Sequence, residues 1–455
     1  MGDVLFIAIA LTTIALGAVN RRAFLWLVVL MSGIPITLMT GDSTYFGALG
    51  GMNGQAAWLF AIVVGCLVAL MGYMGSVPRI LGRTPAFLLF LIFAAISLSW
   101  AWNILEGVRM VAKLAAPMLF FWLLIAMQPD ARLARRLENA LYTSCLIAAG
   151  LALTNTLTFG LIAPPPLKHG LLGFPALATP YSSAANFSFF IVCGALVAYC
   201  RFLASRRMFH LLLSLFLFVC VALAFVRITL AGGLLGLAAI HLVRARPAAT
   251  PLFVGISLLA AMLIVTSGAF MQRMFFVPER VRWSEAITAP EKFLANVNTS
   301  GRTLLWARAT RAFEQESPWV GAGAGTVDTW IKTGDSFKSE LHSEVFRVRL
   351  ELGWVGLAIF IAGLLGLWAK LLRETRRAAR ETLTVAQRAS CALIPVYFIT
   401  LLTDNTFNYA AGFGVLVYGF AALALVAVVH ERRARVPKVA ESSSSSGHGI
   451  VVLAN

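Results

Sequence analysis

The stretch LHSEVFRVRLELGWVGLAIFIAGLLGLWAK, from Leu341 to Lys370, changes character in its middle. Its first part is charged, with His342 close to glutamates and arginines. From Gly353 onward it is an apolar run close to the ~20 residues that cross a hydrocarbon core of ~30 Å. The stretch therefore predicts a helix that enters a membrane directly from a water-exposed loop. A titratable histidine at that boundary marks it as a candidate functional site.

The rest of the chain repeats the apolar pattern. Of its 455 residues, 59% are apolar and 13% are charged, whereas soluble domains average roughly 25% charged residues. This composition predicts an all-α polytopic membrane protein with 12 or 13 transmembrane helices. The candidate spans are 3–19, 23–39, 56–75, 86–101, 105–127, 139–159, 185–200, 208–226, 228–243, 251–269, 351–370, 389–403 and 411–430.

Positive charge orients these spans. The formal net charge of +17 comes from Lys and Arg gathered in alternate connections, which is typical of cytoplasmic loops and not of nucleic-acid binding. The basic connections begin at Arg21, Arg79, Arg132, Arg201, Arg244, Lys370 and His430. Thirteen spans place the N-terminus outside, and twelve follow if the first two short runs do not both cross. We divide the chain into transmembrane helices (1–271), a long periplasmic loop with helices (272–350), further transmembrane helices (351–430) and a flexible cytoplasmic tail (431–455).

The cysteines and the N-terminus add two expectations. All six cysteines fall inside apolar runs, so we expect them to be buried as small hydrophobic residues and to form no disulfides. The start, MGDVLF, has no basic segment before its apolar run, so we expect the first run to remain as a membrane anchor.

The long loop is mixed in charge and predicts a small folded element. GRTLLWARATRAFEQ, from Gly301 to Gln315, has Leu305, Ala309 and Phe313 at helical spacing, with Arg308 and Arg311 on another face. Pro318 and three alternate glycines should end this helix. No Lys-Ser or Lys-Thr follows the glycines, so they are not a nucleotide-binding loop. We expect a second helix over 339–354 that continues into the membrane.

Three outward-side residues are the candidates for chemistry. Arg227 stands between two apolar runs, either with its charge at the lipid interface or with a functional role. Arg302 is the first residue of the loop helix, where its positive charge is unfavourable to the helix dipole. An anion bound there would offset this charge. His342 can act as a base near neutral pH. Glu344 either lies at the same site or pairs with Arg347, three residues later. No metal-spaced group of Asp, His or Cys is visible on the outer loops.

Three motifs carry a resemblance to a known family. They are FVRITLAGGLL around Arg227, GRTLLWARATRAFEQESPWVGAGAGT from Gly301, and LHSEVFRVRLELGWVG from Leu341. With them, the chain resembles a bacterial O-antigen ligase, the WaaL type, within the O-antigen ligase and polymerase superfamily. One departure is Val226, where a serine usually precedes the arginine.

The resemblance implies an inner-membrane glycosyltransferase with a fold similar to other lipid-linked (GT-C-like) glycosyltransferases. Its active site would face the periplasm, and it would use neither a metal nor ATP. The donor would be O-antigen on undecaprenyl diphosphate, and the acceptor a sugar hydroxyl of lipid A–core. The resemblance matches the catalytic residues to His342, Arg302 and Arg227. Expected substrate-binding residues are Arg280 (or Arg282), Arg308, Arg311, Lys168 and Glu344.

Other functions remain open at this point. An O-antigen polymerase or a protein O-oligosaccharyltransferase would use the same donor. The arginine-x10-glycine pattern associated with polymerases is not evident in the long loop. A transporter would have paired charges deep in its spans, and the only candidates are Glu106, Arg109 and Lys113, near the outer end of a span.

Overall fold

The computed structural model describes residues 2–33, 54–76, 81–82, 84–159, 177, 184–244, 284–289, 291–292, 296, 302–333, 340–378 and 384–444, with only the backbone at a few helical positions. The described part contains helices and no strand. The α-helices are α1 (Gly2–Val19), α2 (Arg21–Met31), α4 (Gly54–Met71), α6 (Pro85–Ile96), α7 (Ile104–Met127), α8 (Ala131–Leu157), α9 (Ala184–Ser205), α10 (Met208–Ala224), α11 (Arg227–Arg244), α14 (Glu285–Thr288), α16 (Arg302–Ala312), α17 (Thr326–Thr333), α18 (Glu344–Arg377), α19 (Val385–Thr403) and α20 (Val415–Ser444). Short helices of other types are η2 (Met74–Ser76), η3 (Ser97–Trp100), η6 (Thr406–Tyr409) and the π-helix η7 (Ala410–Gly414).

The helices confirm the predicted fold class. Among the described residues, six helical segments are long and apolar enough to cross a membrane: Ile104–Met127, Ala131–Leu157, Ala184–Ser205, Glu344–Arg377, Val385–Thr403 and Thr406–Arg433. Five shorter apolar helices lie at the predicted spans 3–19, 56–75, 86–101, 208–226 and 228–243. The predicted span 251–269 lies outside the described residues. All six cysteines are buried free thiols, as expected.

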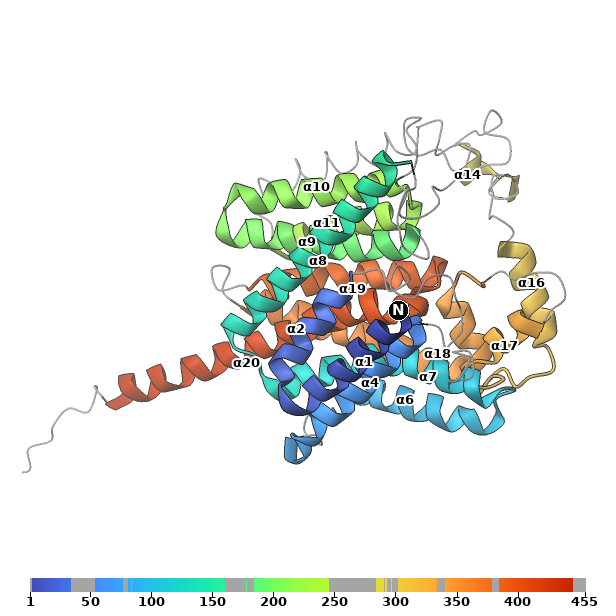
Figure 1. Cartoon of the computed structure of the whole chain (residues 1–455), viewed down its shortest axis with the longest axis horizontal. Coiled ribbons are helices and arrows are strands. Elements are labelled where there is room, and N and C mark those ends of the chain that lie inside the picture. The colour runs from blue at the N-terminus through green and yellow to red at the C-terminus, as the bar shows by residue number, and fades with distance from the viewer. Residues whose placement is uncertain are drawn as a thin grey trace, which may run out of the picture.

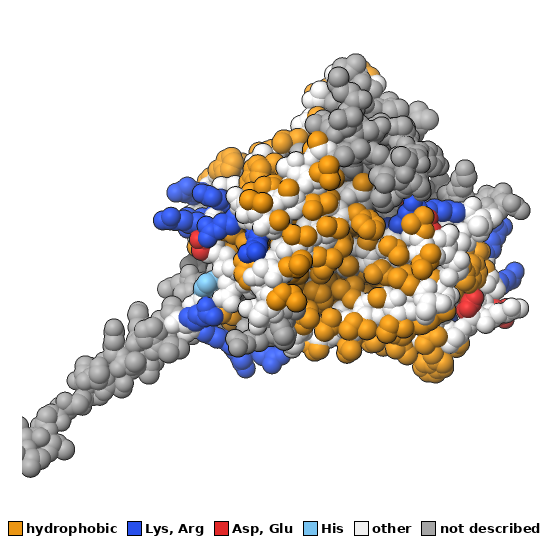
Figure 2. All heavy atoms as spheres, turned by 60° about the horizontal axis from the view of Figure 1, so that its bottom comes forward, with side chains coloured by type: hydrophobic (Ala, Val, Ile, Leu, Met, Phe, Trp, Pro, Cys, Tyr) orange, Lys and Arg blue, Asp and Glu red, His pale blue; other side chains and the backbone are white. Residues whose placement is uncertain are grey.

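The long helices pack into one bundle with a continuous apolar core. In it, α20 packs on α7, α11 on α19, α9 on α10 and α1 on α4. Figure 1 shows α14, α16 and α17 gathered at one end of the bundle, while the C-terminal half of α20 projects from the opposite end. Figure 2 shows a broad band of hydrophobic side chains, with Lys and Arg side chains gathered beside the C-terminal helix and again on the other side of the band. This is the surface expected of a protein that spans lipid.

The helix predicted over 339–354 differs in two ways from the structure. Helix α18 begins only at Glu344, with the Ser343 side chain accepting a hydrogen bond from the Phe346 amide. His342 lies before it in the left-handed region, with φ of 52°. The helix is then interrupted at Gly353 (φ 65°, ψ −170°), so that a short helix, Glu344–Leu352, precedes the long apolar part.

The glycine loop after α16 fills this interruption. A helix break leaves backbone groups without their partners four residues away. Here the Ala322 and Gly323 amides donate to the carbonyls of Leu350 and Glu351, at 3.0 and 2.8 Å. In return, the amides of residues 354 and 355 donate to the carbonyls of residues 318 and 319, at 3.0 and 3.1 Å. A Cβ on Gly353 would lie 2.2 Å from the Trp319 backbone, so the close approach requires glycine.

Candidate active site

Three segments that are far apart in the sequence meet at the end of the bundle that carries α16 and α17. They are the start of α16 at Arg302, the non-helical residues before α18 at His342, and the end of α19 at Thr403–Asn405. Arg302 contacts a residue 101 positions away, and His342 contacts one 63 positions away. The C-terminal end of α19 is therefore the platform on which both predicted catalytic residues lie.

Arg302 is half-buried at the first described residue of α16. Its Nη1 donates a hydrogen bond of 2.8 Å to the carbonyl of Thr403. Burial lowers the pKa of the guanidinium, and the Asp404 carboxylate opposes that shift. The buried Nε has no hydrogen-bond partner within the described part of the chain. A half-buried guanidinium with an unpaired N–H donor can bind an anionic ligand that reaches this end of the bundle.

His342 is held through both its backbone and its ring by Asn405. Its amide donates to Asn405 Oδ1 at 2.9 Å, and its Nδ1 lies 3.0 Å from Asn405 Nδ2. Asp404 Oδ1 lies 3.9 Å from the same ring nitrogen, which is too far for a hydrogen bond. The side chain is 36% exposed. A left-handed residue other than glycine costs about 1–2 kcal/mol, and the contacts with Asn405 hold this one in place.

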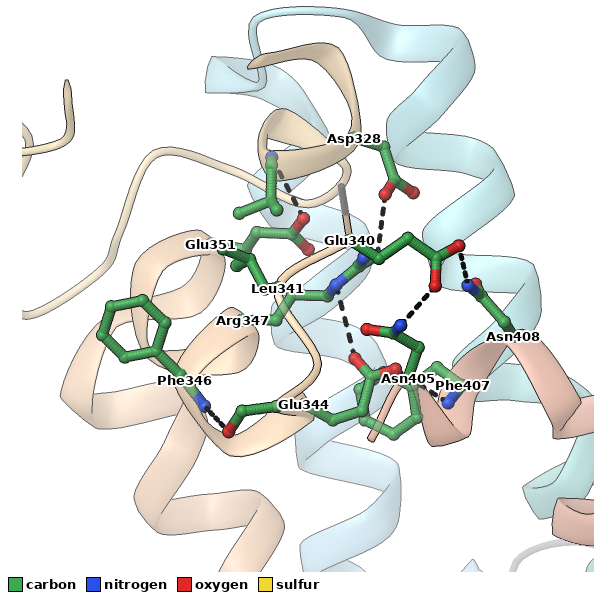
Figure 3. Close-up of polar contacts among 12 residues, drawn as sticks. Asp328, Glu340, Leu341, Glu344, Phe346, Arg347, Glu351, Asn405, Phe407 and Asn408 are labelled. Atoms are coloured by element: carbon green, nitrogen blue, oxygen red, sulfur yellow. Dashed lines mark hydrogen bonds and ion pairs between the residues drawn. The ribbon is translucent and has the colours of Figure 1, made fainter. Parts of the chain in front are cut away.

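Glu340 completes the cluster around Asn405. Its carboxylate accepts hydrogen bonds from the side-chain amides of Asn405 and Asn408, the latter at 2.8 Å. Asn408 Oδ1 in turn accepts from Lys113 Nζ at 2.8 Å. Figure 3 shows Glu340 between the two asparagines, which come from the segment that follows α19.

A buried network of charged side chains lies next to this cluster. The Arg347 guanidinium, 1% exposed, makes ion pairs with Asp328 Oδ1 at 2.9 Å and Glu344 Oε2 at 3.3 Å (Figure 3). Glu344 Oε1 also accepts from the Phe407 amide at 2.9 Å. Burial alone would raise the pKa of Asp328, but Arg347 and Lys113 together hold it well below its usual range. The network joins α7, α17, α18 and η6, so it fixes the elements that carry the site.

The pairing of Glu344 with Arg347, one of the two alternatives from the sequence, is the one that the structure contains. Glu344 is fully buried, so its carboxylate faces the protein interior and not a substrate. The charges in the first turns of α7 are also paired: Glu106 with Arg109 at 2.6 Å and with Lys332 of α17 at 2.7 Å. These pairs join the bundle to the loop helices.

The remaining predicted residues have different places. Arg227 is half-buried at the start of α11. A Cβ on Gly232 of α11 would meet Val396 and Ile399 of α19. The two helices run antiparallel at this contact, so the start of α11 lies toward the end of α19. Arg227 and Thr403 are therefore at the same end of the bundle. Arg308 and Arg311 are exposed on α16, while Lys168, Arg280 and Arg282 lie outside the described residues.

Sequence reasoning missed several polar residues of the site. Asp404, Asn405 and Asn408 belong to TDNTFN, the polar segment between the last two predicted spans. Asp328 follows the glycine loop on α17, a helix that the sequence analysis did not predict. The available signal was a dense polar run between two predicted spans, where a simple connection needs no such side chains.

Comparison with known proteins finds one family that resembles part of this chain. Residues 171–361 match a protein-family model described as O-antigen ligase. Over these residues the chain is similar to the O-antigen ligase and polymerase superfamily. The matched region contains Arg227, Arg302 and His342, and members of this superfamily are glycosyl-transfer enzymes that act in membranes on lipid-linked glycans. A search of curated proteins found no match.

Proposed function

We propose that this protein is an inner-membrane O-antigen ligase that transfers a glycan from undecaprenyl diphosphate to a sugar hydroxyl of lipid A–core in the periplasm. The observation that carries the proposal is the pairing, on one platform at the membrane end, of a half-buried arginine with an unused donor and a partly exposed histidine. Both substrates are lipids, so their reacting ends emerge where this platform lies.

The arginines would bind the diphosphate of the donor. The reaction breaks the bond between the anomeric carbon and a diphosphate oxygen, and the electron pair leaves with the diphosphate. Guanidinium groups stabilise the charge that develops on those oxygens, and they are most effective in a partly dry site where they are already in position. Arg302 is held by the Thr403 carbonyl, and Arg227 lies at the same end of the bundle. Arg308, Arg311, Arg280 and Lys168 are proposed to contact the glycan or its phosphates.

His342 would contact the groups that react. The acceptor hydroxyl oxygen attacks the anomeric carbon from the face opposite the departing diphosphate, which inverts the configuration at that carbon. Glu344 is not available to this step because it is buried against Arg347. We therefore assign Glu344 to supporting the site and His342 to the reacting groups.

The distribution of charge supports a periplasmic location for the site. Basic residues cluster at the ends of helices opposite to the site: Arg132, Arg135, Arg136, Arg206, Arg207, Arg376, Arg377, Arg432 and Arg433. Cytoplasmic connections carry such an excess of Lys and Arg. With that end in the cytoplasm, α16, α17 and the platform face the periplasm.

The test is a reconstituted transfer reaction. Purified protein in lipid nanodiscs is mixed with undecaprenyl-diphosphate glycan and rough lipopolysaccharide, and products are separated on a gel. We expect lipopolysaccharide of increased size, no product with Arg302→Ala, and normal product with Arg349→Ala, an arginine of the same region that lies over Trp354. Chain growth on the lipid diphosphate without lipopolysaccharide would identify a polymerase. No product of either kind from folded wild-type protein would refute the proposal.

A further inference from the structure

The contacts of Asn405 determine which way its side-chain amide faces. Its Oδ1 accepts a hydrogen bond from the His342 backbone amide at 2.9 Å, and its Nδ2 donates to the Glu340 carboxylate. If the amide were rotated by half a turn, Oδ1 would face the carboxylate of Glu340 and Nδ2 would face the N–H of His342. Both contacts would then be repulsive, so the backbone amide and Glu340 fix the orientation.

This orientation places an N–H donor against His342 Nδ1. Asn405 Nδ2 has two hydrogens: one is used by Glu340, and the other points to Nδ1, 3.0 Å away. A neutral imidazole has one nitrogen that accepts and one that donates. Because Nδ1 accepts here, Nε2 must carry the proton.

We infer that Asn405 is a positioning residue that fixes neutral His342 as the Nε2–H tautomer, so that the ring presents a hydrogen-bond donor to the substrates. Nε2 has no hydrogen-bond partner among the described residues, and the side chain is 36% exposed. The other ionisable groups around the ring form no hydrogen bond with it in the described structure. Asp404 is 3.9 Å from Nδ1, Glu340 is engaged by two asparagines, and Arg302 bonds to Thr403.

The inference rests on the proposed function and changes the role expected of His342 from the sequence. A base must offer an in-plane lone pair, and Nε2 of this tautomer has none. Catalytic histidine bases have a partner that accepts from Nδ1–H and so leaves Nε2 free; Asn405 has the opposite polarity. His342 would therefore donate a hydrogen bond to an oxygen of the departing diphosphate. As the hydroxyl oxygen bonds to the anomeric carbon on the face opposite the diphosphate, its proton passes to solvent water on that face, and the diphosphate leaves with the electron pair of the broken bond.

The first test measures the tautomer without any reaction. Protein labelled with 15N-histidine is reconstituted in lipid at pH 8.5, above the ~6.5 at which free histidine titrates. The His342 signals are identified by their loss in His342→Gln. We expect protonated Nε2 and unprotonated Nδ1 in the wild type. Protonated Nδ1 would overturn the inference.

A double substitution reverses the direction of the hydrogen bonds from residue 405 to Glu340 and to His342 Nδ1, and it keeps the shape of these side chains. In Asn405→Asp with Glu340→Gln, the new glutamine amide donates to the new carboxylate, and the glutamine carbonyl can still accept from Asn408. The carboxylate also accepts from the His342 backbone and now from Nδ1–H, which leaves Nε2 unprotonated. We expect the 15N signals to exchange their protonation states. Unchanged signals in this folded double variant would show that Asn405 does not set the tautomer.

Transfer rates then show whether His342 acts as a hydrogen-bond donor or as a general base. A glutamine at position 342 can accept from Asn405 with its carbonyl and donate with its amide, so His342→Gln should lose about tenfold or less if the ring is a donor. Loss of a general base costs about 10²–10⁴-fold, and a loss of that size in His342→Gln would overturn the catalytic part of the inference. The polarity-reversed double variant should be slower than wild type, whereas a base role predicts equal or faster transfer. If the wild type transfers nothing, the proposed function fails, while the 15N result on Asn405 stands separately.

Discussion

Replacing Arg302 by alanine removes a half-buried guanidinium that the structure holds against the α19 platform. The Nη1 bond to Thr403 positions the group, while Nε is left for a ligand. Loss of one preorganised donor to a developing oxyanion costs about 3 kcal/mol, which corresponds to roughly 150-fold in rate. Arg302→Lys keeps the charge, but one ammonium cannot reproduce the planar fork that bonds Thr403 and phosphate together. We expect lysine to recover about tenfold at most.

The measurement is the single-turnover rate at saturating donor, which reports the chemical step and not donor binding. Charge on the diphosphate grows as the bond breaks, so the rate constant should fall more than donor affinity does. Arg349→Ala is the matched control. A rate for Arg302→Ala within threefold of wild type, with unchanged thermal stability, would refute the role of Arg302 in leaving-group stabilisation.

Four further predictions concern the support, orientation and requirements of the site. Arg347→Ala should destabilise the protein by about 3–5 kcal/mol, because it leaves buried carboxylates without their cation; a thermal unfolding midpoint equal to that of wild type would contradict the buried network. The pKa of Asp328 is lowered on folding, so its contribution to stability is complete above about pH 4 and is lost as the pH falls toward its folded value; Asp328→Asn should be less stable at pH 7 and less sensitive to acid between about pH 4 and 2, and an unaltered acid profile would be evidence against the ion pair. Cysteines introduced at the exposed positions Thr310 and Ser205 should be labelled by an impermeant reagent from the periplasm and from the cytoplasm respectively, and the reverse pattern would invert the proposed topology. Transfer should continue in EDTA and without nucleotide, and strict dependence on added Mg²⁺ or Mn²⁺ would contradict the proposed mechanism.

The sequence by itself determined the membrane fold and two residues of the platform. Spans such as 105–127 and 389–403 were predicted within a few residues because transfer of a helix into lipid is a local sum over consecutive side chains. The α16 helix followed from spacing for the same local reason. Arg302 and His342 were singled out by their charge near the membrane and by the family motifs.

Tertiary structure alone decided how those residues are held. The conformation of His342, outside any helix and with positive φ, depends on Asn405, 63 residues later. The break at Gly353 depends on a glycine loop whose backbone replaces the missing helical hydrogen bonds. Hydrogen-bond partners of this kind are chosen by packing between distant segments, and no local pattern specifies them. Whether the exposed nitrogen of His342 carries a proton therefore depends on an amide from another helix end, and not on the histidine's own neighbours in the sequence.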